Sequence, residues 1–228
     1  MSSPKLSAVE MVQSLKKGEI TSEELVKSYI EQIKKKEKEV EAWEFFDQEL
    51  VLKQAKKLDE LHQSGKHGDL HGIPVGIKDI FDTEDMPTTD GTEIHKKNPS
   101  WNDCTVVSKL KQAGAIIMGK TVTAELAYYS PGKTKNPHDT TRTPGGSSSG
   151  SAAAVASHMV PLAVGSQTNG SVIRPASYCG VVGYKRTKGL ISRHLVLQIS
   201  RALDQVGVFA NSIEDAALIS EQLIGHDK

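Results

Sequence analysis

Residues 143–183 restrict the fold more than any other segment, because Gly, Ser and Ala fill 21 of these 41 positions. A composition of this kind is typical of a flexible linker. Aliphatic residues such as Leu162, Val164 and Ile173 are interleaved with the small ones, however, and residues 152–156 favour a helix. We therefore interpret the small residues as positions where two backbones approach closely or adopt unusual dihedral angles. Such a segment suits a site built partly from main-chain groups.

The first 72 residues carry a denser charge than the rest of the chain. They hold 12 Lys or Arg and 14 Asp or Glu, against 16 and 14 in residues 73–228. Ser7 with Glu10, and Thr21 with Glu24, have the spacing of capping boxes, which predicts two helix starts. The mixed-sign run at residues 34–39 is interpreted as a solvated helix face. We expect residues 1–72 to be a charged helical segment.

From residue 73 onward, short apolar runs alternate with a helical pattern. Residues 73–78 predict a strand with one proline near its start, and residues 115–118 predict a buried strand. Between them, Asp103 is predicted to cap a helix that ends at Gly114. This order predicts an α/β fold with a mixed, mainly parallel sheet flanked by helices.

Charge and cysteine content exclude several classes of function. Lys plus Arg equals Asp plus Glu at 28 each, which argues against a general binder of nucleic acids or anionic membranes. The aliphatic runs are far shorter than the ~18 residues that a membrane span needs, and residues 1–5 lack an apolar signal core. Two cysteines exclude a disulfide framework and a four-cysteine zinc site. We expect a cytoplasmic protein whose histidines are surface or satisfied polar groups.

Two short motifs match known patterns without their structural context. Residues 114–121 satisfy the phosphate-loop pattern, but a helix is predicted before them and four apolar residues fill the loop, so nucleotide binding is not expected. Residues 146–150 contain the Gly-x-Ser-x-Gly elbow of α/β-hydrolases, which must follow a strand. Here a loop precedes it, and neither His158 nor His194 has an evident acid partner. We therefore set both motifs aside.

A longer constellation of motifs is more specific. It comprises GIPVGIKD at 72–79, PGGSSSGSAAA at 144–154, GSQTNGSVIRPA at 165–176 and CGVVGYK at 179–185. In this order the motifs resemble the amidase signature family, and among its members the small-substrate, malonamidase-like amidases. The resemblance implies hydrolysis of a carboxylic amide to acid and ammonia through an acyl-enzyme. It implies no metal and no organic cofactor.

The family's Ser–cis-Ser–Lys triad carries over to three positions. Lys78 would be the base, Ser147 the bridging serine after a cis peptide bond, and Ser171, 24 residues on, the nucleophile. A serine hydroxyl needs a base, and a buried lysine can serve because desolvation disfavours its charged form. The residues alone leave open whether Lys78 is that base or a surface lysine at a strand end.

Further site residues follow from the same resemblance. The oxyanion hole would be the backbone amides of Thr168, Asn169, Gly170 and Ser171, since amides fixed in advance stabilise a tetrahedral intermediate. We expect Ser148 to hydrogen-bond within the serine cluster and to contribute to substrate binding. Cys179 is interpreted as a small core residue.

Arg174 lies one position further from the nucleophile than the arginine usual in the family. It either holds the loop through a buried acid or lines the acyl pocket and binds the carboxylate of a small anionic amide. The sequence leaves these two roles open.

The chain also departs from the family pattern. Asn169 stands where Gly is common, Arg186 stands where Pro is frequent, and family members are much longer. We expect residues 1–228 to form a single amidase signature domain that is C-terminally incomplete, with residues 73–228 as its catalytic core. We expect no direct nucleic-acid or membrane partner, and leave open a homo-oligomer or a separate C-terminal half.

Two other functions stay open. Residues 202–207 and 224–227 look like the glutaminase subunit of a tRNA-dependent amidotransferase, although Gln167 and the order of residues 171–174 differ from that pattern. A truncated, inactive fragment that acts only as a binding or vestigial domain is the other alternative.

Overall fold

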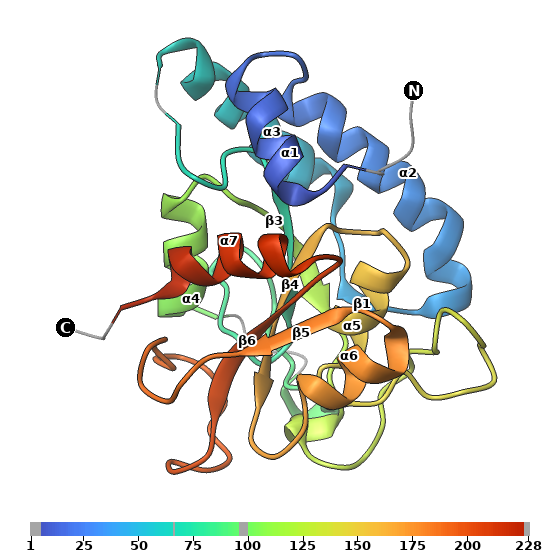
Figure 1. The fold of residues 1–228 in the computed structure, drawn as a ribbon. Helices are drawn as coiled ribbons and strands as arrows, with labels where there is room; N and C mark the ends of the chain where they lie inside the picture. The colour runs from blue at the N-terminus through green and yellow to red at the C-terminus, as the bar shows by residue number, and fades with distance from the viewer. Residues whose placement is uncertain (1–5, 66, 96–99, 226–228) are drawn as a thin grey trace.

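The computed structural model describes residues 6–65, 67–95 and 100–225. The predictions made from residues 1–5 and from residues 226–227 lie outside the described residues. Helices surround one central sheet (Figure 1). The α-helices are α1 (Ala8–Lys16), α2 (Ser22–Val40), α3 (Gln48–Gln63), α4 (Thr105–Gln112), α5 (Ser149–Ala156), α6 (Ile173–Cys179) and α7 (Ile213–Leu223). Two single 3-10 turns, η1 (Glu93–His95) and η2 (Glu125–Ala127), lie in the connections.

The described strands form one six-stranded sheet in the order β1-β3-β2-β4-β6-β5. Their bounds are β1 (Trp43–Phe45), β2 (Pro74–Lys78), β3 (Ile116–Thr121), β4 (Leu162–Gln167), β5 (Val182–Lys185) and β6 (Gln205–Ala210). β2 is parallel to both of its neighbours, whereas β1 and β6 run in the opposite direction. β5 pairs antiparallel with β6 and so follows the direction of β4. The predicted mixed α/β fold with a flanked sheet is confirmed.

The N-terminal helices begin where the capping patterns predict. Ser7 and Thr21 each accept a hydrogen bond from the backbone of the glutamate three residues on, and each glutamate bonds back to its cap. The prediction for Asp103 is wrong, because Cys104 is the N-cap of α4. The Asp103 carboxylate instead accepts the Glu84 amide and pairs with Lys111 at 2.7 Å. Residues 1–72 also supply β1, so this segment shares the central sheet.

The helices pack against the sheet in two groups. In Figure 1, α7 crosses in front of the sheet, and it contacts α4, α1 and β6. The second group is α5 with α6, where α5 contacts β2, β3 and β4 and α6 contacts β5. The core lies between these helices and the strands, and both β2 and β3 are buried along their whole length, as central strands with two covered faces must be.

Helix α5 is made of small residues because it is enclosed. Seven of its eight residues are buried. A Cβ on Gly150 would lie 2.3 Å from both the carbonyl oxygen of Ala42 and the amide nitrogen of Val122. The backbones therefore approach as closely as the composition of residues 143–183 predicts. This approach fixes the start of α5, where Ser147 and Ser148 lie, next to the ends of β3 and β4.

Candidate active site

Lys78 ends strand β2 and points into the protein. Its side chain is fully buried, and its Nζ donates hydrogen bonds to the Oγ of Ser147 at 2.7 Å and of Ser166 at 2.9 Å. Burial lowers the pKa of Lys78 to about 7, and the negative charge of Asp204 opposes this shift. A large fraction of the amine is therefore neutral at neutral pH, which is the form that accepts a proton. Lys78 is therefore not a surface lysine, and its role as a base stays a prediction.

Ser147 receives the shorter of these two hydrogen bonds. It is 2% exposed, and the peptide bond between Gly146 and Ser147 is cis, as the family resemblance predicts. The Ser147 carbonyl accepts the Ala124 amide at 3.0 Å, which ties the residue to the segment after β3. Lys78 and Ser147, 69 residues apart in sequence, thus meet as predicted.

Ser148 joins the end of β4 to the start of α5. Its Oγ donates to the carbonyl of Ser166 at 3.2 Å and accepts the amide of the same residue at 3.3 Å. Its own amide donates to the carbonyl of Ser171 at 3.4 Å. Ser148 therefore belongs to the serine cluster, as predicted, while its contact with substrate stays a prediction.

Ser171 lies in the loop between β4 and α6. It is 7% exposed. Among the described residues no hydrogen bond joins its hydroxyl to Ser147. The structure brings Lys78 and Ser147 together, and the Ser148 amide links Ser171 to the same cluster. The role of Ser171 stays a prediction.

The loop before Ser171 carries the backbone amides that are predicted to form the oxyanion hole. Among the described residues, no hydrogen bond is donated by the amides of Thr168, Asn169, Gly170 or Ser171. The next two amides, of Val172 and Ile173, both donate to Oε1 of Gln167 at 2.9 Å. A buried glutamine side chain thus closes the turn and leaves the preceding amides for a ligand. This arrangement suits an oxyanion hole, in which fixed donors surround a developing negative charge.

Arg174 lies in the first turn of α6 and is exposed. Its Nη1 donates to the carbonyl of Gly146 at 3.1 Å, and its Nη2 to Oδ1 of Asn169 at 3.4 Å. A Cβ on Gly170 would lie 2.7 Å from Nη2, so the glycine makes room for the guanidinium. Among the described residues Arg174 pairs with no carboxylate, so it holds the loop through a carbonyl rather than through the expected acid. A guanidinium has five N–H donors, and some of them remain for a substrate.

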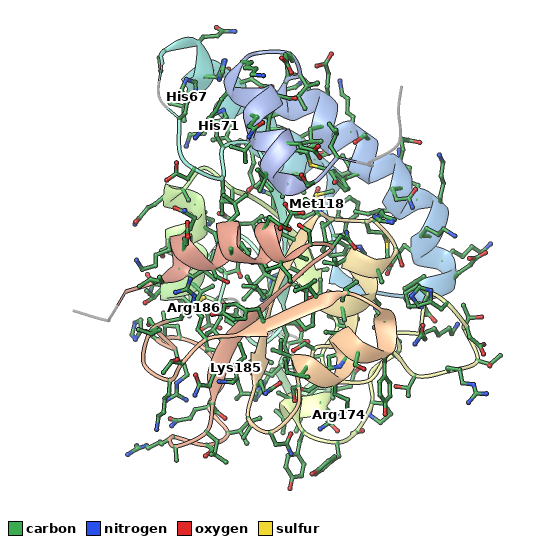
Figure 2. All side chains as sticks on the ribbon, viewed as in Figure 1. His67, His71, Met118, Arg174, Lys185 and Arg186 are labelled. Carbon is green, nitrogen blue, oxygen red and sulfur yellow. The ribbon has the colours of Figure 1, made fainter. Side chains whose placement is uncertain are left out.

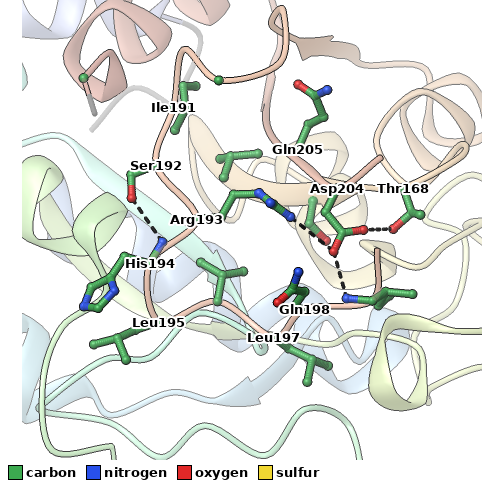
Figure 3. A pocket seen from close by; sticks show the side chains of 16 residues that line it. Thr168, Ile191, Ser192, Arg193, His194, Leu195, Leu197, Gln198, Asp204 and Gln205 are labelled. Carbon is green, nitrogen blue, oxygen red and sulfur yellow. Dashed lines mark hydrogen bonds and ion pairs between the residues drawn. The ribbon is translucent and has the colours of Figure 1, made fainter. Parts of the chain in front are cut away.

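A cavity of about 540 Å³ opens beside the lysine. One wall is the segment at residues 189–199, and the other comprises Ser166, Thr168 and residues 204–206 (Figure 3). Ser166 lines this cavity and accepts a hydrogen bond from Lys78, so one residue separates the cavity from the lysine. Ser147 and Ser171 are not among the residues that line it.

The family model described as Amidase matches residues 24–228. The chain belongs to the amidase family. It is 43% identical, over 97% of its length, to the glutamyl-tRNA(Gln) amidotransferase A-subunit of Natranaerobius thermophilus, and 41% identical over 98% to that of Thermobifida fusca. It covers 47% and 46% of these two proteins, so the chain spans about half the length of the curated relatives it matches.

Solved structures of amidases share this fold. The native peptide amidase of Stenotrophomonas maltophilia superposes with a TM-score of 0.93 at 31% identity, over 99% of this chain and 49% of that one. The glutamyl-tRNA(Gln) amidotransferase A-subunit of Thermotoga maritima superposes with a TM-score of 0.82 at 36% identity, over 98% and 48%. Both comparisons match nearly the whole of this chain to about half of a longer one.

Asp204 is a residue of this amidase-family site that the sequence analysis missed. It is 7% exposed, and its carboxylate accepts the hydroxyl of Thr168 at 2.6 Å and the amides of Ile199 and Ser200 at 2.8 Å each. Arg193 pairs with it at 3.4 Å. Asp204 therefore connects the predicted oxyanion loop to the cavity wall, as Figure 3 shows. In the sequence, residues 202–207 were noted only for their likeness to an amidotransferase subunit. No local pattern indicates that the Asp204 carboxylate belongs to the site.

A second missed feature is the buried ion pair of Asp79 and Lys120. Neither side chain is exposed, and the Lys120 Nζ lies 3.3 Å from the Asp79 carboxylate. Lys120 also donates to the carbonyl of Phe81 at 2.8 Å and to the hydroxyl of Thr88 at 2.6 Å. Residues 114–121, which match the phosphate-loop pattern, thus contain strand β3. Lys120 of this strand holds the segment that follows Lys78 through its hydrogen bond to Phe81.

Cys179 is buried, as predicted for a core residue. Its Sγ lies 3.5 Å from the carbonyl of Pro144, and burial raises the pKa of its thiol to about 12. A thiol with so high a pKa is not a nucleophile at neutral pH.

No described helix is both long and apolar enough to cross a bilayer.

Proposed function

We propose that this chain carries the catalytic residues of an amidase that hydrolyses a carboxylic amide to the acid and ammonia. The observation that carries the proposal is the buried Lys78 amine, 2.7 Å from the Ser147 hydroxyl and with a pKa lowered to about 7. Family membership supports the reaction class, because the same residues lie in the matched range 24–228.

In this proposal Lys78 acts as the general base through Ser147. Neutral Lys78 takes the proton of the Ser147 hydroxyl while Ser147 takes that of Ser171, and the Ser171 oxygen attacks the amide carbon. The amides of residues 168–171 bind the resulting oxyanion. The C–N bond then breaks, and the proton returns through Ser147 to the leaving nitrogen, which departs as ammonia. Water attacks the acyl-enzyme by the same route and releases the acid.

The substrate class we propose is a small anionic amide. Arg174 supports this choice, because its exposed guanidinium lies against Gly146, the residue that precedes the bridging serine. A free N–H pair there can bind a carboxylate on the acyl side of the substrate.

A second candidate is the glutaminase subunit of a tRNA-dependent amidotransferase. The observation that favours it is the name shared by curated relatives at 40–43% identity, each the A-subunit of a glutamyl-tRNA(Gln) amidotransferase. In that role the same acyl-enzyme would release ammonia from glutamine to a partner subunit. Copurification of the natural gene product with partner subunits and tRNA supports this candidate, and isolation of a free chain that hydrolyses simple amides contradicts it.

A non-catalytic domain is the remaining alternative, since the chain spans about half of its relatives. A fluorophosphonate probe separates it from an enzyme, because such probes react only with an activated serine. We expect labelling of the folded chain that disappears in Ser171→Ala and persists in Ser157→Ala, a buried serine outside the site. A folded chain that takes no label supports the inactive domain.

A further inference from the structure

Three histidines meet on the far side of the fold from Arg174 (Figure 2). His62 lies in the last turn of α3, His67 in the loop that follows, and His71 just before β2. The Nδ1 atoms of His62 and His67 are 3.1 Å apart, and one ring nitrogen from each of the three lies within 4.8 Å of the others.

His71 is the buried member of this cluster. Its side chain is 2% exposed, and its Nε2 has no hydrogen-bond partner among the described residues. The sequence interpretation of histidines as surface or satisfied groups is therefore wrong for His71. A buried polar atom without a partner is destabilising, and a bound ligand would remove that penalty. The ring centroids of His62 and His67 lie 5.7 and 5.3 Å from that of His71, so the unpaired ring lies against the other two.

The backbone around His71 is fixed. Its amide donates to the carbonyl of Gly68, and a Cβ on Gly114 would lie 3.0 Å from its Cα. The exposed His67 is free to adjust instead. The cluster thus combines one rigid ligand with one adaptable ligand.

The neighbouring carboxylates are already engaged. Asp59 accepts the amides of Ser22 at 2.7 Å and Glu23 at 3.0 Å, and Asp69 pairs with Lys16 at 3.4 Å. The donor set is therefore three imidazole nitrogens. Neutral imidazole is the form that coordinates metal ions.

We propose that His62, His67 and His71 bind one Zn²⁺ ion, with water as the fourth ligand on the exposed side of His67. Imidazole nitrogen suits Zn²⁺, and Zn–N bonds of about 2.0–2.1 Å in a tetrahedron place ligand nitrogens about 3.4 Å apart. The Nδ1 atoms of His62 and His67 are 3.1 Å apart and all three ligand nitrogens lie within 4.8 Å of one another, so a small rotation of the exposed His67 ring can complete the tetrahedron.

The ion would join two parts of the fold. It would link the end of α3 to the segment entering β2, seven residues before Lys78. Its role is structural, and it is independent of the proposed amidase reaction.

The test is a zinc titration of the metal-free, tag-free chain by calorimetry. His67→Asn removes an exposed ligand without disturbing the core. His158→Asn is the matched control, because it removes an exposed histidine elsewhere, at a positive φ that asparagine tolerates. We expect one Zn²⁺ per chain, unchanged in the control and bound at least tenfold more weakly in His67→Asn. Zinc should also raise the Tm of the parent and the control by more than that of His67→Asn.

Co²⁺ serves as a spectroscopic probe of the same site. We expect the intense visible absorption of tetrahedral Co²⁺ in the parent and the control, and its loss in His67→Asn and His71→Asn. Equal affinity in His67→Asn and the control, or the absence of stoichiometric zinc in the parent, overturns the proposal. A loss of binding shared by the control identifies adventitious surface histidines and overturns it as well.

Discussion

The amine of Lys78 donates to the hydroxyl of Ser166 at 2.9 Å, and Ser166 also lines the cavity beside the site. Ser166 was not predicted as a site residue, yet it is one of two hydroxyls that hold the amine in place. Its position on β4, the strand next to β2, follows from parallel pairing, which brings the carboxyl ends of both strands to one edge.

We expect Ser166→Ala to reduce kcat/KM by roughly fivefold, since one buried hydrogen bond contributes about 1 kcal/mol. The hydroxyl oxygen accepts from the amine and so stabilises its charged form. Its removal should move the acidic limb of the pH–rate profile, which we expect near pH 7 in the parent, to lower pH. Ser157→Ala is the control. An unmoved acidic limb would show that Ser166 does not position the base, and a limb unchanged in Lys78→Ala would refute the base itself.

The lowered pKa of Lys78 also predicts how stability depends on pH. Between pH 7 and about 10 the folded amine is mostly neutral while the unfolded amine is protonated. The unfolded state then binds more protons, so the free energy of unfolding rises with pH, by up to roughly 1.4 kcal/mol per unit. Denaturation in urea at pH 7, 8 and 9 should show this slope in the parent relative to Lys78→Met. A difference between the two that does not change with pH contradicts the shift.

The two serines should respond differently to alanine. Ser171→Ala should abolish acyl-enzyme formation, because it removes the attacking oxygen. Ser147→Ala should slow labelling without abolishing it, because a water molecule can carry the proton in place of the lost hydroxyl. Mass spectrometry of the labelled peptide tests the assignment, and a label on Ser147 with Ser171 free would reverse the two roles.

Arg174→Ala should distinguish substrate binding from support of the loop. If the guanidinium binds a carboxylate, kcat/KM for an anionic amide should fall by roughly ten- to a hundredfold, as a charge-assisted hydrogen bond of about 1.5–3 kcal/mol implies. A neutral amide of equal size should lose much less. Equal losses on both substrates would assign Arg174 to holding Gly146 and Asn169 alone.

Local patterns predicted the local features of this chain well. The capping boxes at Ser7 and Thr21 depend on residues three apart, and both form. The cap at Asp103 failed because Lys111 and the Glu84 amide compete for the same carboxylate. Such competition becomes visible only once the chain has folded.

The features that the sequence did not predict depend on contacts between residues far apart in the chain. Asp204 meets Thr168 across 36 residues, and Lys120 meets Phe81 across 39, with no periodicity to indicate either contact. Lys78 and Ser147 are even further apart, and they were predicted only because an entire family pattern supports them. The histidine cluster had no such pattern, and its members are spaced too unevenly for a helix or strand face to reveal it.

The cavity wall at residues 189–199 is one continuous stretch of chain, separate from the enclosed helix α5 that begins two residues after Ser147. This separation matters for protein engineering. A single cassette of randomised codons over residues 191–198 would vary most of one wall while leaving Lys78 and Ser147 unchanged. Selection for activity on new amides should therefore enrich substitutions in that stretch. Libraries built in α5 should yield mainly insoluble protein, because larger side chains there would clash with the neighbouring backbone.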